Sequence, residues 1–132
     1  MTREEFLATQ FPALAAWIHG AAATGLRSRV YERDGVAAQV SPAVPGASLF
    51  NSVTYRDAGA LREALPSLEA IYDDAGVRAW TVWVHESDIA ASALLSDAGH
   101  VLDAAPEGMG CGRRAVARTG PPARCRRYRP CR

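Results

Sequence analysis

The sequence has 132 residues, of which 48% are apolar and 22% are charged, a size and composition typical of one soluble globular domain. No run reaches the ~18 apolar residues that a membrane span needs, and acidic residues stand where a leader peptide would be basic. These features argue against a membrane protein, and we expect a cytoplasmic one.

Charge divides the chain in two after Met109. Residues 1–109 contain 7 arginines and 14 acidic residues, whereas residues 110–132 contain 8 arginines, no acid and all three cysteines, Cys111, Cys125 and Cys131. An odd number of cysteines at one end is not a disulfide framework, and their irregular spacing fits no standard zinc site. We therefore predict one domain over residues 1–109, a disordered Arg/Pro/Gly/Cys-rich tail over 110–132, and no metal site.

The first half of the chain predicts a helix, a hairpin and a strand. Thr2 and Glu5 form a capping box, and apolar residues then recur at steps of four and three, which predicts a helix over about 3–22. Two β-prone runs flank Asp34-Gly35, the strongest short signal for a hairpin. Residues 41–48 contain two prolines and a glycine and predict a surface loop, after which residues 49–55 predict a third strand.

The second half alternates helices and strands. A long helix is predicted over 57–76, and the apolar run 77–84 predicts a buried central strand. Ser87 or Asp88 can cap a further helix that ends at Gly99, and a strand should follow. The predicted fold class is α/β, in the order helix, hairpin, strand, helix, strand, helix, strand.

The tail has two competing interpretations. A basic arm could bind phosphate backbones without sequence specificity. Alternatively, its Arg, Gly, Pro, Ala and Cys residues are all encoded by GC-rich codons. A chain with 15 Arg and no Lys indicates a GC-rich gene, and an out-of-frame reading of such DNA would give this composition. We favour the frameshift, because the change in composition is abrupt and falls within an apparent β element. Nucleic-acid binding through the tail stays as the less favoured alternative.

Two places could carry chemistry. His85 and Glu86 follow the central strand in a polar loop, where they are candidates for a general base, although such loops more often only cap the next helix. Arg56 and Gly59 stand where the third strand gives way to its helix. There, free backbone N–H groups and one cation could hold a pyrophosphate. In the plainer interpretation, Asp57 caps the helix and Gly59 is an incidental first-turn residue.

In the order of its elements and in two local motifs, the chain resembles the GCN5-related N-acetyltransferase (GNAT) superfamily over residues 1–109. After a strand, that family has the motif [Arg/Gln]-x-x-Gly-x-[Gly/Ala], and the backbone amides of this motif hold the acetyl-CoA pyrophosphate. Here the chain reads Arg56-x-x-Gly59-x-Leu61. Later the family has Asn-x-x-Ala-x-x-Leu-Tyr-x-x-x-Gly-Phe, and here the chain reads Asp88-x-x-Ala91-x-x-Leu94-Leu95-x-x-x-Gly99-His100. The resemblance implies a GNAT-like mixed sheet with helices on both faces.

The departures from the family motifs imply a weakened site. The family's Tyr commonly protonates the leaving CoA thiolate, and Leu95 has no proton to donate. Leu61 replaces a small residue where the backbone approaches a phosphate closely, so we expect its side chain to oppose that approach.

The resemblance therefore implies an acetyltransferase-like domain with a degraded acetyl-CoA site. We interpret it as the non-catalytic N-terminal half of a truncated tandem protein, whose partner would be a second GNAT domain or another copy of itself. The alternative is an active acetyl-CoA-dependent N-acyltransferase acting on a small-molecule or peptide amine. In that case Arg56 and Gly59 would hold the pyrophosphate and His85 or Glu86 would serve as base. Acetyl-CoA is the cofactor if the domain is active, and otherwise none is expected.

Overall fold

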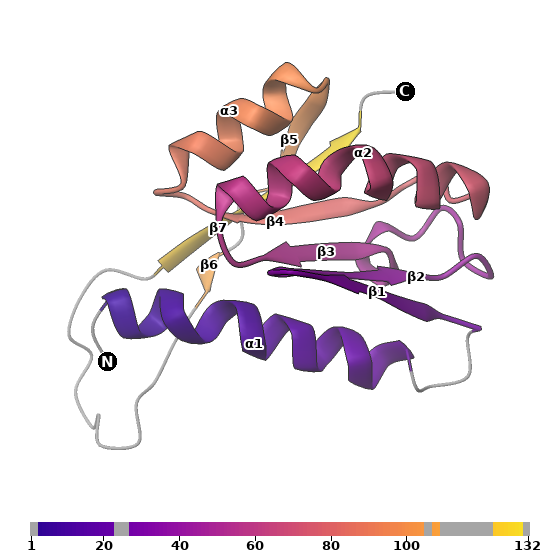
Figure 1. Ribbon diagram of the computed structural model, residues 1–132, viewed down its shortest axis with the longest axis horizontal. Coiled ribbons are helices and arrows are strands. Elements are labelled where there is room, and N and C mark those ends of the chain that lie inside the picture. Colours follow the sequence, from indigo (N-terminus) through magenta and orange to yellow (C-terminus); the bar gives the residue numbers. More distant parts are fainter. Residues whose placement is uncertain (1–2, 23–26, 105–106, 109–122, 131–132) are drawn as a thin grey trace.

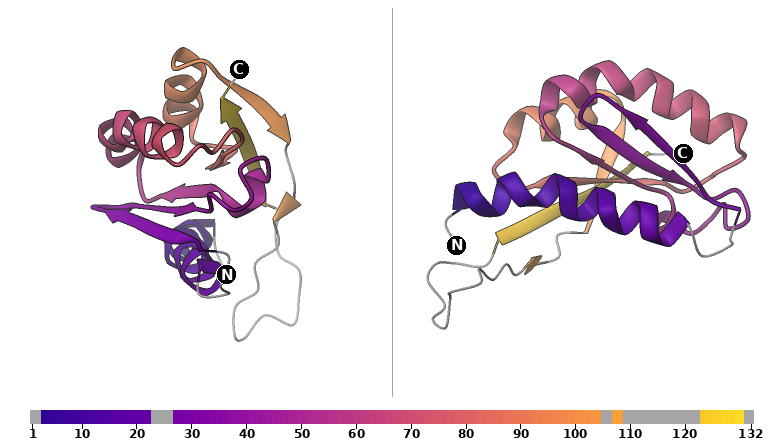
Figure 2. Two further views of the ribbon diagram at one scale, coloured as in Figure 1. Left: turned by 90° about the vertical axis from the view of Figure 1, so that its right-hand side faces the viewer. Right: turned by 60° about the horizontal axis from the view of Figure 1, so that its bottom comes forward.

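The computed structural model describes residues 3–22, 27–104, 107–108 and 123–130. In this part of the chain a seven-stranded mixed sheet carries helix α1 on one face and helices α2 and α3 on the other (Figures 1 and 2). The predicted α/β fold, with helices packed on both faces of a mixed sheet, is therefore confirmed. No helix in the described ranges is long and apolar enough to cross a membrane.

The N-terminal elements lie where the sequence predicts them. Helix α1 (Arg3–Ala22) continues through Pro12 without interruption. Strands β1 (Arg29–Arg33) and β2 (Val36–Val40) form an antiparallel hairpin, and Gly35 adopts the left-handed conformation at its turn, with φ of 76°. The Asp-Gly signal was therefore a correct guide to the local structure.

Two strands begin later than predicted. Leu49 and Phe50 belong to a short 3-10 turn (Ser48–Phe50), so β3 is confined to Ser52–Tyr55. The predicted strand 77–84 is wrong at its start, because the backbone N–H groups of Arg78 and Ala79 donate to the carbonyl of Pro45, at 2.8 and 3.0 Å. These groups are directed to a loop instead of to a neighbouring strand, and β4 spans Thr81–His85.

The two helices after β3 and β4 follow their capping signals. Helix α2 (Ala58–Asp74) begins after Asp57 and contains Pro66, and Gly76 follows its end with φ of 71°. Helix α3 (Ile89–Asp97) begins after Asp88, and Gly99 follows it with φ of 87°. Strand β5 (His100–Ala104) comes next, and then the short β6 (Glu107–Gly108).

The tail contains the one large departure from the predicted fold. Residues 123–130 form strand β7 (Ala123–Pro130), which lies between β4 and β5 and runs antiparallel to both. The prediction of a disordered tail is therefore wrong for these residues. The strand pairs through the backbone of β4 and β5, and this pairing requires no particular side chain. The side chain of Tyr128 is only 4% exposed and packs in the core. Residues 109–122 and 131–132 lie outside the described residues.

The main core lies between the sheet and helices α2 and α3. Val53 and Val82 contribute to it from the neighbouring strands β3 and β4, and the ring of Trp80 stacks on Tyr72 with 4.7 Å between centroids. Side chains alternate along the strands, so the neighbours of these valines point to the face that carries α1. That second face buries several polar side chains, Gln39, Ser52, Thr54 and Thr81, beside the apolar Ala37 of β2 and Ile18 of α1.

Candidate functional site

The candidate site lies at the edge of the sheet where β3 and β4 end. These strands are parallel neighbours, paired at Ser52 with Thr81 and at Val53 with Val82, and each leads into a helix. Parallel strands therefore bring the starts of α2 and α3 to the same edge, which is where α/β folds usually bind ligands. Arg56 and Gly59 lie at the start of α2, and His85 and Glu86 lie between β4 and α3.

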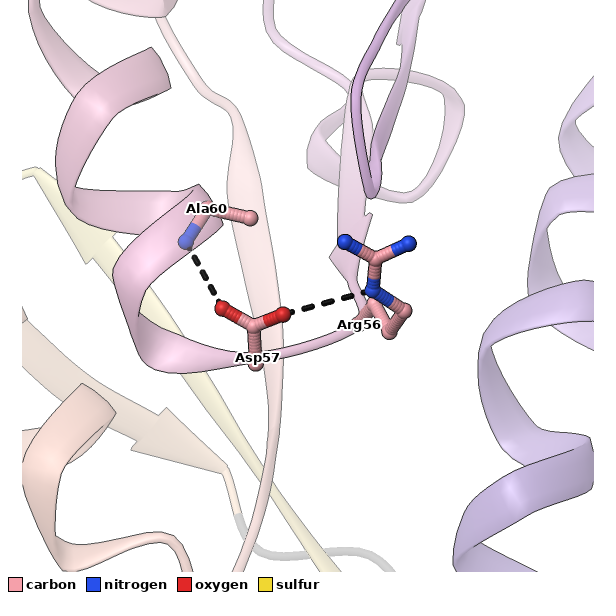
Figure 3. Close-up of polar contacts among 3 residues, drawn as sticks. All are labelled: Arg56, Asp57 and Ala60. Carbon is pink, nitrogen blue, oxygen red and sulfur yellow. Dashed lines mark hydrogen bonds and ion pairs between the residues drawn. The ribbon is translucent and has the colours of Figure 1, made fainter.

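The start of α2 is capped by its own carboxylate. Asp57 Oδ1 accepts the backbone N–H of Ala60 at 2.9 Å, and Arg56 Nε donates to Asp57 Oδ2 at 3.3 Å (Figure 3). The N–H of Ala60, and then the guanidinium of Arg56, hold the pKa of the Asp57 carboxyl below its ordinary value of 3.8. A negative charge therefore already occupies the place that an anionic ligand would take.

Gly59 provides room for this cap. A Cβ placed on Gly59 would lie 3.2 Å from Asp57 Oδ1, closer than ordinary contact. The plainer prediction for this segment, that Asp57 caps the helix, is therefore confirmed, and the geometry gives Gly59 a role in that cap. The backbone of Arg56 is also fixed to the hairpin, because its backbone N–H donates to the carbonyl of Gly35 at 2.7 Å.

The start of α3 has the same kind of cap and one additional contact. Asp88 Oδ1 accepts the backbone N–H of Ala91 at 3.0 Å, and Asp88 Oδ2 accepts the hydroxyl of Tyr55 at 2.8 Å. Tyr55 is the last residue of β3 and packs against the main core. The sequence patterns predicted no role for Tyr55. Its position as a polar-tipped aromatic residue directly before Arg56 was the available signal.

His85 and Glu86 lie apart from the two caps. His85 is buried at the end of β4 and alternates with Val84 of the main core, so its ring points to the opposite face of the sheet. Its Nδ1 lies 2.7 Å from Ser87 Oγ and accepts the backbone N–H of Ser87 at 3.2 Å. The lone pair that a general base would use thus already has a local donor, whereas Glu86 is exposed.

The two leucines at family motif positions both lie in the main core. Leu61 is 0% exposed, so the expectation that its side chain would obstruct a phosphate at the helix start is wrong. The side chain points inward, between α2 and the sheet. Leu95 is likewise 0% exposed, and it carries no group that can donate a proton.

Together, the described residues form two adjacent helix starts, and in each an aspartate accepts a backbone N–H of the first turn. Tyr55, at the end of β3, connects the two through its hydrogen bond to Asp88. Within the described ranges, no three His, Cys, Asp or Glu side chains come together in a way that could hold a metal ion. No protein-family model, no curated protein and no solved structure matches the chain.

Proposed function

We propose that the chain is a GNAT-like acetyltransferase domain with a weakened acetyl-CoA site, acting as a non-catalytic or partner-dependent half of a larger assembly. One observation carries the proposal. The two segments that resemble the family's motifs, which begin at Arg56 and Asp88, lie at neighbouring helix starts at one edge of the sheet. The resemblance to the family assigns its cofactor to these two segments.

The same edge gives the reason for a weak site. A pyrophosphate at the start of α2 would compete with the Asp57 carboxylate for the N–H of Ala60 and would be repelled by its charge. It would also have to draw Arg56 away from Asp57. These costs reduce affinity without preventing the fold.

The chemistry of acetyl transfer is also incomplete. Leu95 stands at the position of the family's proton donor and is enclosed in the core. A partner domain, either a second GNAT domain or another copy of this chain, would supply the complete site. In this proposal the chain contributes a scaffold that binds acetyl-CoA weakly.

Titration of isotope-labelled protein with acetyl-CoA tests the location of binding by NMR. We expect amide shifts to concentrate at the first turns of α2 and α3, residues 58–60 and 89–91, and to saturate only well above micromolar concentrations. Shifts confined to other elements, or none at any concentration, would refute the proposal.

An enzymatic assay separates this proposal from the active alternative. Acetyl transfer to amines, abolished by Gly59→Arg, would favour an active N-acyltransferase with Arg56 and Gly59 at the cofactor and His85 or Glu86 as base. An absence of transfer together with weak, localised binding is the result that our proposal predicts.

A further inference from the structure

Strand β5 forms one outer edge of the sheet. Among the described residues it pairs with β7 alone, so the backbone groups on its other side meet no strand of the described chain. Such an edge can pair with another chain, and proteins usually protect it with charged side chains, proline or a bulge. A bulge protects β5 only in part. Its pairing with β7 is regular at His100, Val101 and Leu102, and the register shifts between Leu102 and Ala104.

The regular segment of β5, residues 100–102, can pair with the same segment of a second copy. In an antiparallel pair about a twofold axis, Val101 faces Val101 of the copy and His100 faces Leu102 of the copy, so no like charges meet. The opposite edge of the sheet, β1, has the sequence RVYER. The same pairing of β1 sets Arg29 opposite Arg33 of the copy, and like charges directly opposite each other are destabilising. Charge therefore permits self-pairing at β5 and opposes it at β1.

The β5 edge also exposes large apolar side chains. Leu102 is 53% exposed, and Ile89 is 77% exposed at the start of α3, the helix that packs against β5. Leu102 is paired in register with Tyr128 of the main core, so it lies on the face of the sheet that carries α3. Figure 2 shows α3 and β5 together at the side of the sheet away from β1. The edge and the helix beside it thus offer apolar surface to a chain that extends the sheet.

We propose that two copies of the chain associate through β5 into one continuous sheet, with their α3 helices side by side across a twofold axis. The inference rests on the proposed function for the need of a partner, and it deepens that function by naming a second copy and the surface that binds it. Because the paired segment is short, Leu102 and Ile89 supply much of the contact. We therefore expect a dimer that dissociates at micromolar concentrations.

Sedimentation of the full chain, from micromolar to nearly millimolar concentrations, measures this association. Leu102→Lys places a charge in the interface, and the half-exposed position lets the lysine remain solvated in the monomer. Leu49→Lys is the matched control, because Leu49 is 47% exposed but precedes β3, which β4 and β7 separate from β5. We expect the wild type to dimerise, Leu102→Lys to raise the dissociation constant about tenfold or more, and Leu49→Lys to leave it unchanged.

Hydrogen exchange locates the interface without any variant. Amides of residues 100–102 should exchange severalfold more slowly in concentrated than in dilute wild-type protein, whereas amides of β1 should not respond to concentration. A wild type that stays monomeric throughout the range overturns the proposal. So does a dimer that Leu102→Lys fails to weaken, that Leu49→Lys weakens equally, or that leaves exchange at residues 100–102 unchanged.

These outcomes are distinguishable from failure of the proposed function. A monomer that binds acetyl-CoA weakly at the first turns of α2 and α3 overturns the β5 dimer and leaves the acetyl-CoA site of the proposed function standing. A β5 dimer that binds no acetyl-CoA supports the dimer and overturns that site.

Discussion

His100 should make the domain lose stability as the pH falls below neutrality. The side chain is 4% exposed, lies edge-on to Trp80 with 5.0 Å between centroids, and has Nε2 3.7 Å from Glu69 Oε1. Burial lowers the pKa of His100 from its ordinary value of 6.5, and the Glu69 carboxylate only partly opposes this shift. The folded state therefore binds the proton less readily than the unfolded state does.

The sign and size of the effect follow from this difference. Well above pH 6.5 both states are neutral at His100, and the contribution of its burial to the free energy of unfolding is fully present. As the pH falls below that value, the unfolded state takes up the proton first, so the free energy of unfolding decreases by at most about 1.4 kcal/mol per pH unit. The loss levels off once the pH passes below the lowered pKa of the folded state.

Urea unfolding between pH 4.5 and 8 measures this contribution. His100→Phe keeps an aromatic ring against Trp80 and should flatten the curve of stability against pH below 6.5, whatever its effect on stability at pH 8. Glu69→Gln removes the carboxylate that opposes the shift, so acid destabilisation should continue to a lower pH than in the wild type. If the wild-type and His100→Phe curves run parallel below pH 6.5, the buried, neutral state of His100 is refuted.

Two further predictions concern the strand and the turn that frame the site. Tyr128→Ala, which removes a core side chain contributed by β7, should lower the free energy of unfolding by about 3 kcal/mol, whereas the exposed Arg129→Ala should change it little. Equal small effects in chemical denaturation would indicate that β7 is not packed in the sheet. Gly35→Ala should destabilise by more than about 1 kcal/mol, because φ is 76° and the new Cβ would lie 3.2 Å from the Arg56 guanidinium. Gly46→Ala meets nothing within 4 Å and is its control, so similar thermal unfolding of both variants would contradict the strain argument.

Local signals predicted the fold up to β5 because each element carries its own boundary residues. The hairpin at Gly35, the caps at Asp57 and Asp88, and the glycine at 99 all act within a few positions of sequence. Strand β7 could not be predicted in this way. Its sequence, ARCRRYRP, has four arginines and no continuous apolar alternation, and its strand conformation depends on partners in β4 and β5.

In the candidate site, too, the features set by local sequence were predicted and those set by distant contacts were not. The sequence predicted that Arg56 and Gly59 stand at a helix start, and it offered the Asp57 cap as one interpretation. It could not show that the side chain of Leu61 points inward, because the direction of a first-turn residue depends on how the helix packs on the sheet. The bond from Tyr55 to Asp88 was also out of reach, since it depends on the parallel pairing of two distant strands.

In the proposed function, the Asp57 carboxylate occupies the anion position at the start of α2 and weakens acetyl-CoA binding. Calorimetric titration of acetyl-CoA into the wild type and into Asp57→Ser tests it most directly. Serine caps a helix about as well as aspartate but brings no charge and releases Arg56, so the variant should bind acetyl-CoA severalfold more tightly than the wild type. Micromolar binding by the wild type with acetyl transfer to amines, or equal affinity of the two proteins, would refute this role of Asp57.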